Sequence, residues 1–126
     1  MTTAVKLAVV APSPVSDGEL VERMAAGDRD ALGELFDRHH RALYSFLARA
    51  SDASEAEIDD LVQTAFLEAF RAAPRFRGAA SPRTWLFAIA SNLARMHRRA
   101  TRRRARALRR LADQPERTAS PLDAAL

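Results

Sequence analysis

Arginines are the residues of this chain best placed to do chemistry, and that chemistry is the binding of a polyanion. Residues 71–112 contain 13 arginines and no acidic residue, whereas residues 1–70 contain six basic and 13 acidic side chains. Guanidinium groups bind phosphates through paired hydrogen bonds and displace counterions from nucleic acid. One basic and one acidic part within a single short chain indicate two kinds of partner, one of them a polyanion.

Many of these arginines belong to a helix whose start is clearly marked, with Ser81 suited to the cap and Pro82 to the first helical position. Apolar spacing predicts that the packed part ends near Ala100 or Thr101, and that the helix continues only when bound. The predicted buried face comprises Leu86, Ile89, Leu93, Met96 and Ala100, and later Leu108 and Leu111. The opposite face is predicted to carry Arg95, Arg98, Arg99, Arg102, Arg106 and Arg109, and an edge to carry Trp85, Asn92 and Arg103.

Two helices are predicted before the middle of the chain. Ser16 and Glu19 have the spacing of a capping box, and Gly27 is suited to end this short helix. Asp28 or Asp30 then caps a helix of some twenty residues. Its predicted buried face comprises Leu32, Leu35, Phe36, His39, Leu43, Phe46, Leu47 and Ala50. This second helix is predicted to be a buried scaffold helix.

A third helix is predicted to begin at the capping box of Ser54 and Glu57 and to end at Pro74. Its inner face comprises Ile58, Leu61, Val62, Ala65, Phe66, Ala69 and Phe70. Its outer face comprises Asp59, Asp60, Gln63, Thr64 and Leu67. This outer face is either an ordinary solvated surface or a surface on which another protein docks.

Composition predicts an all-α fold, a compact bundle of about four helices in residues 16–112. Residues 1–15 are expected to be a disordered tail and 113–126 a linker or tail. A secretory signal in the first stretch is the alternative, but Lys6 interrupts its apolar run. The chain has no cysteine, which excludes disulfides and fits a cytoplasmic location. It has no apolar run long enough to span a membrane.

No catalytic constellation is evident, so we expect a binding protein that is not an enzyme and needs no cofactor. The chain lacks a glycine-rich phosphate loop and a nucleophile with an adjacent base. His39 and His40 could suggest a metal site, but a histidine at the edge of the core beside a solvated one is the reading we favour. We therefore predict no metal site.

The chain resembles region 2 of bacterial sigma factors of the extracytoplasmic-function (ECF) group in two linked stretches, AEIDDLVQTAFLEAFRAAPRFRG and TWLFAIASNLARMHRR. The preceding ELVERMAAGDRDALGELFDRHHRALYSFL resembles the start of the same domain, so the resemblance spans about residues 17 to 105. It implies a helical domain that binds core RNA polymerase in the cytoplasm. It also implies recognition and melting of the minus-ten promoter element during transcription initiation.

The family's motifs assign roles to particular positions. Its DLVQ motif falls on Asp60, Leu61, Val62 and Gln63, which implies that the outer face of Asp59, Asp60, Gln63, Thr64 and Leu67 docks on the clamp helices of the largest polymerase subunit. The family's loop after FRG falls on residues 78–82 and implies a pocket for a base flipped from the non-template strand. The residues expected to contact DNA are Gly78, Ala79, Ala80, Ser81, Arg83, Trp85, Asn92, Arg95, Arg98, Arg99, Arg102 and Arg103. Trp85 is either a stacking platform for a base or a core residue.

The sequence departs from the family pattern in three places. Thr64 stands where members usually have an acid, and Met96 where many have aspartate. Members also continue into a second domain, with a helix-turn-helix that reads the minus-thirty-five element, after a linker like residues 113–126. The chain is either a piece of a longer protein or a form that works without this domain. The resemblance further implies an anti-sigma factor as a partner.

Two other functions remain compatible with the residue pattern. One is a generic helical DNA-binding domain that holds the phosphate backbone without polymerase. The other is a protein-interaction adaptor that uses its third helix alone. The promoter sequence, the inducing signal and the oligomeric state are not encoded in any motif of the chain.

Overall fold

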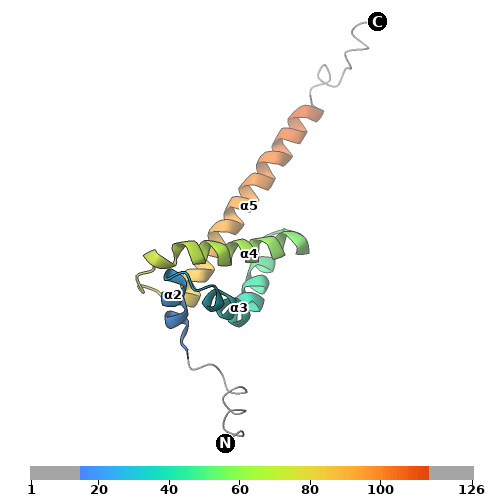
Figure 1. Ribbon diagram of the computed structural model, residues 1–126. Coiled ribbons are helices and arrows are strands. Elements are labelled where there is room, and N and C mark those ends of the chain that lie inside the picture. Colours follow the sequence, from blue (N-terminus) through green and yellow to red (C-terminus); the bar gives the residue numbers. More distant parts are fainter. Residues whose placement is uncertain (1–14, 114–126) are drawn as a thin grey trace, which may run out of the picture.

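A bundle of helices with one long projecting helix makes up the computed structural model, which describes residues 15–113 (Figure 1). The elements are α2 (Asp17–Ala25), α3 (Arg29–Ala50), α4 (Glu55–Ala72), the 3-10 turn η1 (Ala73–Arg75) and α5 (Pro82–Ala112). The predicted all-α fold of about four helices is confirmed. The expected tail and linker lie outside the described residues except for Val15 and Asp113. Val15 packs against the core, and the N–H of Asp113 donates to the carbonyl of Arg109 at the end of α5.

Local hydrogen bonds begin the first two helices where the sequence predicts. The Ser16 hydroxyl accepts a hydrogen bond from the N–H of Glu19 at 3.1 Å. Asp28, not Asp30, caps α3, because its carboxylate accepts from the N–H of Asp30 at 2.9 Å. Between them Gly27 has φ of 92°, a backbone conformation that strongly favours glycine.

The caps of α4 and α5 also match the prediction. Ser54 accepts from the N–H of Glu57 while the Glu57 carboxylate accepts from the N–H of Ser54, so this capping box is complete. The hydrogen bonds that the Glu57 carboxylate receives, first from the backbone N–H and then from the side chain of Ser54, lower the pKa of Glu57 below its usual value. The Ser81 hydroxyl accepts from the N–H of Thr84 at 3.1 Å, and Pro82 occupies the first turn of α5.

The core lies where α2, α3, α4 and the first half of α5 meet. From α2 to α4 its buried side chains include Leu20, Met24, Leu35, Leu43, Leu47 and Phe66. Helix α5 contributes Leu86, Ala90 and Ala94, which form a single stripe at four-residue spacing. Small residues on this stripe allow α5 to lie close to its neighbours.

The apolar face predicted for α5 is wrong beyond Leu93. Met96 is 55% exposed, and Leu108 and Leu111 are also exposed, because the buried stripe passes through the alanines instead. The packed part does end near Ala100 as predicted, and the helix itself continues to Ala112. Figure 1 shows this second half leaving the bundle as a projecting rod.

A polar cluster ties α2, α3 and α5 together at the edge of the core. The Asp17 carboxylate pairs with Arg38 at 3.0 Å and accepts from His39 Nε2 at 2.7 Å. Burial alone would raise the pKa of Asp17, but the bonds and charges of His39 and Arg38 outweigh burial and lower it. The Nη1 atom of Arg83 lies 3.4 Å from His39 Nδ1, which links α5 to the same cluster.

Candidate nucleic-acid and protein-binding faces

The loop before α5 forms a hollow of about 280 Å³ against the first turns of that helix. Its lining combines loop residues with one face of α5, and consists of Arg75, Phe76, Arg77, Gly78, Ala79, Ala80, Thr84, Trp85 and Ala88. The half-buried Trp85 ring packs on Phe76 with ring centroids 4.9 Å apart, so it serves as a wall of the hollow and also contacts the core. Small side chains at its rim and an aromatic wall suit a single planar base.

Backbone geometry fixes the shape of this loop. Gly78 has φ of 77°, while a Cβ placed on it would meet no atom within 4 Å. Conformation, not space, therefore requires glycine here. The Ser81 hydroxyl also donates to Thr84 Oγ1 at 3.0 Å, so this predicted site residue holds the loop against α5 as its cap.

One face of α5 continues from the hollow along the whole helix. At about 100° per residue, Trp85, Asn92, Arg99 and Arg103 fall on one line. Arg95 and Arg102 flank this line on one side, and Arg95, Arg99, Arg102 and Arg103 are exposed. The Arg95 guanidinium donates to the side-chain oxygen Oδ1 of Asn92 at 3.0 Å, which leaves the side-chain NH2 group of Asn92 free to donate to another acceptor. The structure thus brings together most of the predicted DNA-contacting residues.

Two predicted DNA-contacting arginines lie elsewhere, on the side of α5 that packs against α3. Arg83 stacks over the Phe87 ring at 4.7 Å in addition to its approach to His39. Arg98 is half-buried and donates to the backbone carbonyl of Ala50 at the end of α3, at 2.6 Å. The prediction that Arg98 shares the exposed face with Arg95 and Arg99 is therefore wrong, because Arg98 follows Ala94 on the packed side.

The predicted outer face of α4 is exposed throughout. Asp59, Asp60, Gln63, Thr64 and Leu67 all point to solvent, and Leu67 is 55% exposed. Neither of the two aspartates forms an ion pair with another described residue. Burial, together with the carboxylates of Glu55 and Asp59, raises the pKa of nearby Tyr44, as expected beside unbalanced negative charge. This face is called the α4 docking face below.

An apolar groove of about 420 Å³ lies beside the α4 docking face, between α3 and α4. It shares Gln63 and Leu67 with that face, and its remaining lining is Arg29, Leu32, Gly33, Phe36, Asp37 and Phe66. The sequence prediction placed Leu32 and Phe36 in the core from their helical spacing, and it did not predict this groove. Both side chains are half-buried, because they lie at the edge of the buried stripe. The sequence prediction also missed Phe76 and Ala88, which line the hollow before α5. The position of Phe76 in the loop could have indicated its role, whereas nothing in the sequence indicates that of Ala88.

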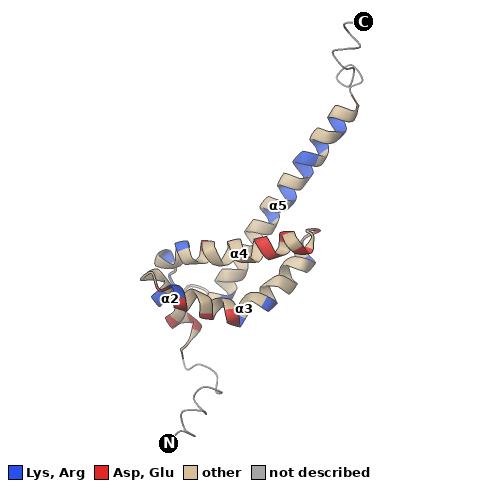
Figure 2. Ribbon diagram, turned by 45° about the vertical axis from the view of Figure 1, so that its right-hand side comes forward, with Lys and Arg blue, Asp and Glu red and all other residues tan. Residues whose placement is uncertain are grey.

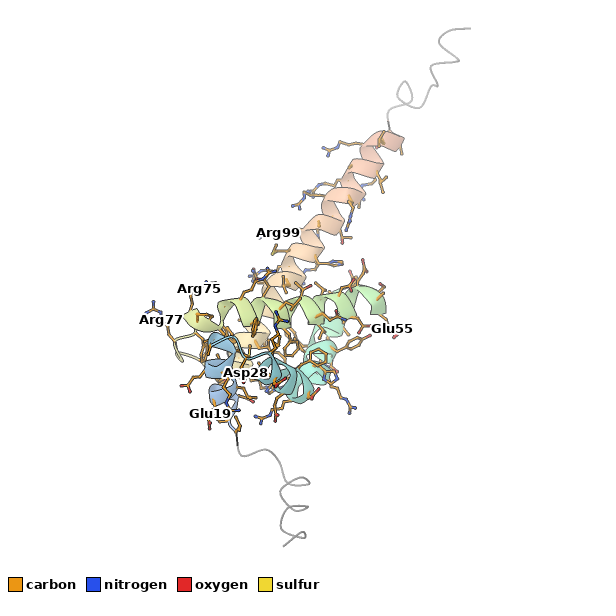
Figure 3. The ribbon with its side chains drawn as sticks, viewed as in Figure 1. Glu19, Asp28, Glu55, Arg75, Arg77 and Arg99 are labelled. Carbon is orange, nitrogen blue, oxygen red and sulfur yellow. The ribbon has the colours of Figure 1, made fainter. Side chains whose placement is uncertain are left out.

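The acidic and basic surfaces lie apart except where the start of α4 meets the middle of α5 in a hollow lined by Asp52, Glu57, His97, Arg98, Thr101 and Arg102. Figure 2 shows acidic residues on α2, α3 and the start of α4, and basic residues along the projecting part of α5. In Figure 3, Glu55 lies at one end of α4, while Arg75 and Arg77 lie by the loop at the other end. Arg99 lies where α5 leaves the bundle, away from Glu19 and Asp28. Glu57 approaches α5, with its carboxylate 3.8 Å from His97.

The paired histidines contact other protein groups. His39 is 9% exposed and bonded to Asp17, and His40 donates to the carbonyl of Phe36 at 2.8 Å while it stacks on that ring. Among residues 15–113 no three potential metal ligands lie together. Within the same residues, none of the helices has both the length and the apolar character that a bilayer crossing needs.

The fold and its surfaces define a small helical binding domain with opposite charges on separate faces. Residues 35–104 match the family model of sigma-70 region 2. The chain therefore belongs to the sigma-70 region 2 family.

Relatives within this family are ECF sigma factors, a class of proteins that are not enzymes. The chain is 44% identical over 77 residues to the ECF RNA polymerase sigma factor SigM of Mycobacterium tuberculosis, which covers 61% of this chain and 39% of that protein. It is 37% identical over 90 residues to the ECF RNA polymerase sigma-E factor of Haemophilus influenzae, which covers 71% and 47%. The chain thus spans less than half the length of these relatives.

A solved structure resembles most of the chain. It is an engineered region 2 of sigmaE, determined by NMR in complex with GTAAAA, and it matches with a TM-score of 0.66 at 33% identity. The match covers 75% of this chain and 97% of that one. The predicted family and fold are both confirmed.

The two neighbouring arginines Arg98 and Arg99 make a matched pair for testing these orientations. We expect Arg98→Gln to lower the free energy of unfolding by about 1 kcal/mol, because the bond to the carbonyl of Ala50 is lost. Arg99→Gln removes the same charge from an exposed position and should change it by less than about 0.5 kcal/mol. Urea denaturation of both variants measures the difference. Equal losses would contradict the packed position of Arg98.

Proposed function

We propose that this chain is the promoter-recognition module of a sigma factor, which binds core RNA polymerase and melts the minus-ten element by binding and not by catalysis. The observation that carries the proposal is the continuity of the loop hollow with the exposed arginine face of α5. The loop and α5 thereby offer a hollow that can hold an unstacked base, next to cations that can bind the phosphates. The solved relative, a region 2 in complex with GTAAAA, supports this reading.

In this proposal the promoter duplex melts because the hollow captures a base that has left the stack. Removing a base from the stack costs a few kcal/mol, and an aromatic wall returns about 1–3 kcal/mol per stacked base. In the proposed complex the hollow at Gly78, Ala79 and Ala80 holds a base of the non-template strand against Trp85. The polar edges of the neighbouring bases and their phosphates are bound by Asn92, Arg95, Arg99, Arg102 and Arg103. Arg83 and Arg98 act indirectly in this proposal, by fixing α5 on α3.

The α4 docking face supplies the second contact in the proposal. Its acidic rim and the exposed Leu67 next to the apolar groove suit a partner with basic and apolar side chains. We assign it to the clamp helices of the largest polymerase subunit, which places the chain in the bacterial cytoplasm. An anti-sigma factor would inhibit by covering the same face, since occupation by one protein excludes the other.

Base capture can be tested by closing the hollow. A single strand selected by the chain from a random pool should bind better than a scrambled strand, with quenching of the single tryptophan. Ala79→Leu fills the hollow and should abolish this preference while weak, salt-sensitive binding remains, because the arginine face is intact. Fluorescence titration measures both strands. Ala48→Leu, at an exposed position on α3, is the matched control and should leave the preference unchanged.

The outcomes separate the proposal from its alternatives. If no strand is enriched but affinity still falls steeply with salt, the chain is a generic DNA-binding domain. If affinity does not depend on salt, in place of a log–log slope of about −0.7 per single-strand phosphate contact, the chain is a protein-interaction adaptor.

Polymerase docking can be tested by reversing charge on the α4 docking face. Asp60→Arg should abolish co-purification with core RNA polymerase, because it places a cation among the acidic side chains of the face. Glu22→Arg makes the same change at an exposed position on α2 and should leave the association intact. Retained binding by Asp60→Arg, or equal loss in both variants, would reject this face as the docking site.

A further inference from the structure

His39 is 9% exposed and is the one polar residue buried in the core of residues 15–113. A buried polar group without hydrogen bonds would destabilise the fold, so its contacts explain its position. Both ring nitrogens of His39 have partners on other helices. Nε2 lies 2.7 Å from the Asp17 carboxylate on α2, and Nδ1 lies 3.4 Å from Nη1 of Arg83 on α5. This pair of contacts is called the His39 bridge below.

The two partners of the His39 bridge require a neutral ring. A guanidinium group only donates hydrogen bonds, so Nδ1 must accept from Arg83. An ionised carboxylate only accepts them, so Nε2 carries the proton and donates to Asp17. Asp17 is ionised at neutral pH: burial raises its pKa, but the bonds and charges of His39 and Arg38 outweigh burial and lower it.

Arg83 connects the His39 bridge to the loop hollow. It lies in the first turn of α5, directly before Thr84 and Trp85, which line the hollow. At about 100° per residue, Arg83 and Trp85 point to nearly opposite sides of the helix. A contact on the packed side of this turn therefore fixes the wall of the hollow on its other side. Arg83 is otherwise exposed, so its guanidinium can turn away once the contact with His39 is lost.

We propose that His39 is a positioning residue for base capture: through Arg83 it holds the first turn of α5 and the Trp85 wall of the loop hollow, and only its neutral form does so. This inference rests on the proposed function and adds control of the same site by pH. In the proposed complex His39 lies in the core and contacts no DNA.

Protonation of His39 breaks one half of the bridge. Histidine ordinarily gains its charge between pH 8 and pH 5. Nε2 donates to Asp17 in both forms of the ring, so α2 and α3 remain linked. A second proton on Nδ1 would face the Arg83 guanidinium, and two donors of like charge form no hydrogen bond. Acid thus releases α5 without opening the contact between α2 and α3.

The charges around the ring favour this one-sided release. They are carried by Asp17 of α2, by Arg38 of α3 with its partner Glu34, and by Arg83 of α5. The Asp17 carboxylate attracts a protonated ring, whereas the Arg83 guanidinium repels it. Arg38 remains paired with Asp17 and Glu34 whichever form the ring takes.

The first test uses the free chain and needs no DNA. Trp85 is the single tryptophan, so quenching of its fluorescence by acrylamide reports the exposure of the hollow wall. We expect quenching to increase from about pH 8 to about pH 5.5. His39→Gln should abolish this increase, because an amide offers a donor and an acceptor but does not titrate. Quenching that is independent of pH in the unaltered chain, or equally dependent in His39→Gln, would overturn the proposal.

The other two histidines supply matched controls. His40→Gln and His97→Gln each remove one titrating ring outside the bridge and should leave the pH dependence unchanged. Circular dichroism at both pH values verifies that every variant is folded. Loss of the pH dependence in His97→Gln would assign the effect to the contact of His97 with Glu57 and would contradict the role of His39.

The second test measures strand preference, the ratio of affinities for the selected and the scrambled single strand. At about pH 8, His39→Leu should lower this ratio by about threefold, as expected for one weak hydrogen bond, and His39→Gln should retain it. Arg83→Met removes the donor and should lower the ratio equally. The two changes combined should cost no more than either alone, since both break the same bridge. Additive losses would sink the proposal.

Two further readouts separate positioning from other roles. Ile58→Val weakens the core at the start of α4 and should leave the ratio unchanged, so an equal fall there would reduce His39 to a general stabiliser. Arg83→Met should leave the log–log salt slope unchanged. A slope reduced by about 0.7 would show that Arg83 contacts a phosphate itself, against the proposal.

Failure of this inference is distinguishable from failure of the proposed function. An unaltered chain that prefers no strand would reject the proposed function, and quenching in the free chain would still decide whether His39 positions Trp85. A chain that keeps its full strand preference in His39→Leu would overturn the positioning role while base capture stands.

Discussion

Burial of one end of α5 is the interaction on which the rest of the structure depends. Leu86, Ala90 and Ala94 fix the first half of this helix in the core, and Arg98 extends the attachment through its bond to the carbonyl of Ala50. A free helix with so many adjacent arginines would be weakened by their repulsion. Because packing fixes its first turns, the helix can carry an uncompensated row of cations into solvent without losing its orientation.

The same anchoring keeps the two charges apart. Acids on α2 and α3 are partly neutralised locally, as in the pairs of Arg38 with Asp17 and Glu34. Asp59 and Asp60 on α4, and the arginines of α5 beyond Ala100, form no ion pair among the described residues. Each surface thus keeps its full charge for an external partner. Separate faces let one small domain hold two macromolecules together, which is what the proposed function requires.

Features set by near neighbours in the chain could be predicted from the sequence. The helix caps at Ser16, Ser54 and Ser81 depend on residues three positions away, and the exposure of the α4 docking face follows from helical phase. The side of α5 that packs could not be predicted, since it depends on how closely two helices approach. Close approach favours Ala90 and Ala94 over the larger Met96.

The central claim is that the α4 docking face and the exposed arginine face of α5 bind their partners independently, and simultaneous binding tests it most directly. The affinity of the full chain for its selected single strand should be measured alone and with saturating core RNA polymerase fragment that contains the clamp helices. The account predicts a ternary complex in which the strand binds at least as tightly as before. Displacement of the strand by the fragment would show that the two partners share one surface and would contradict the account.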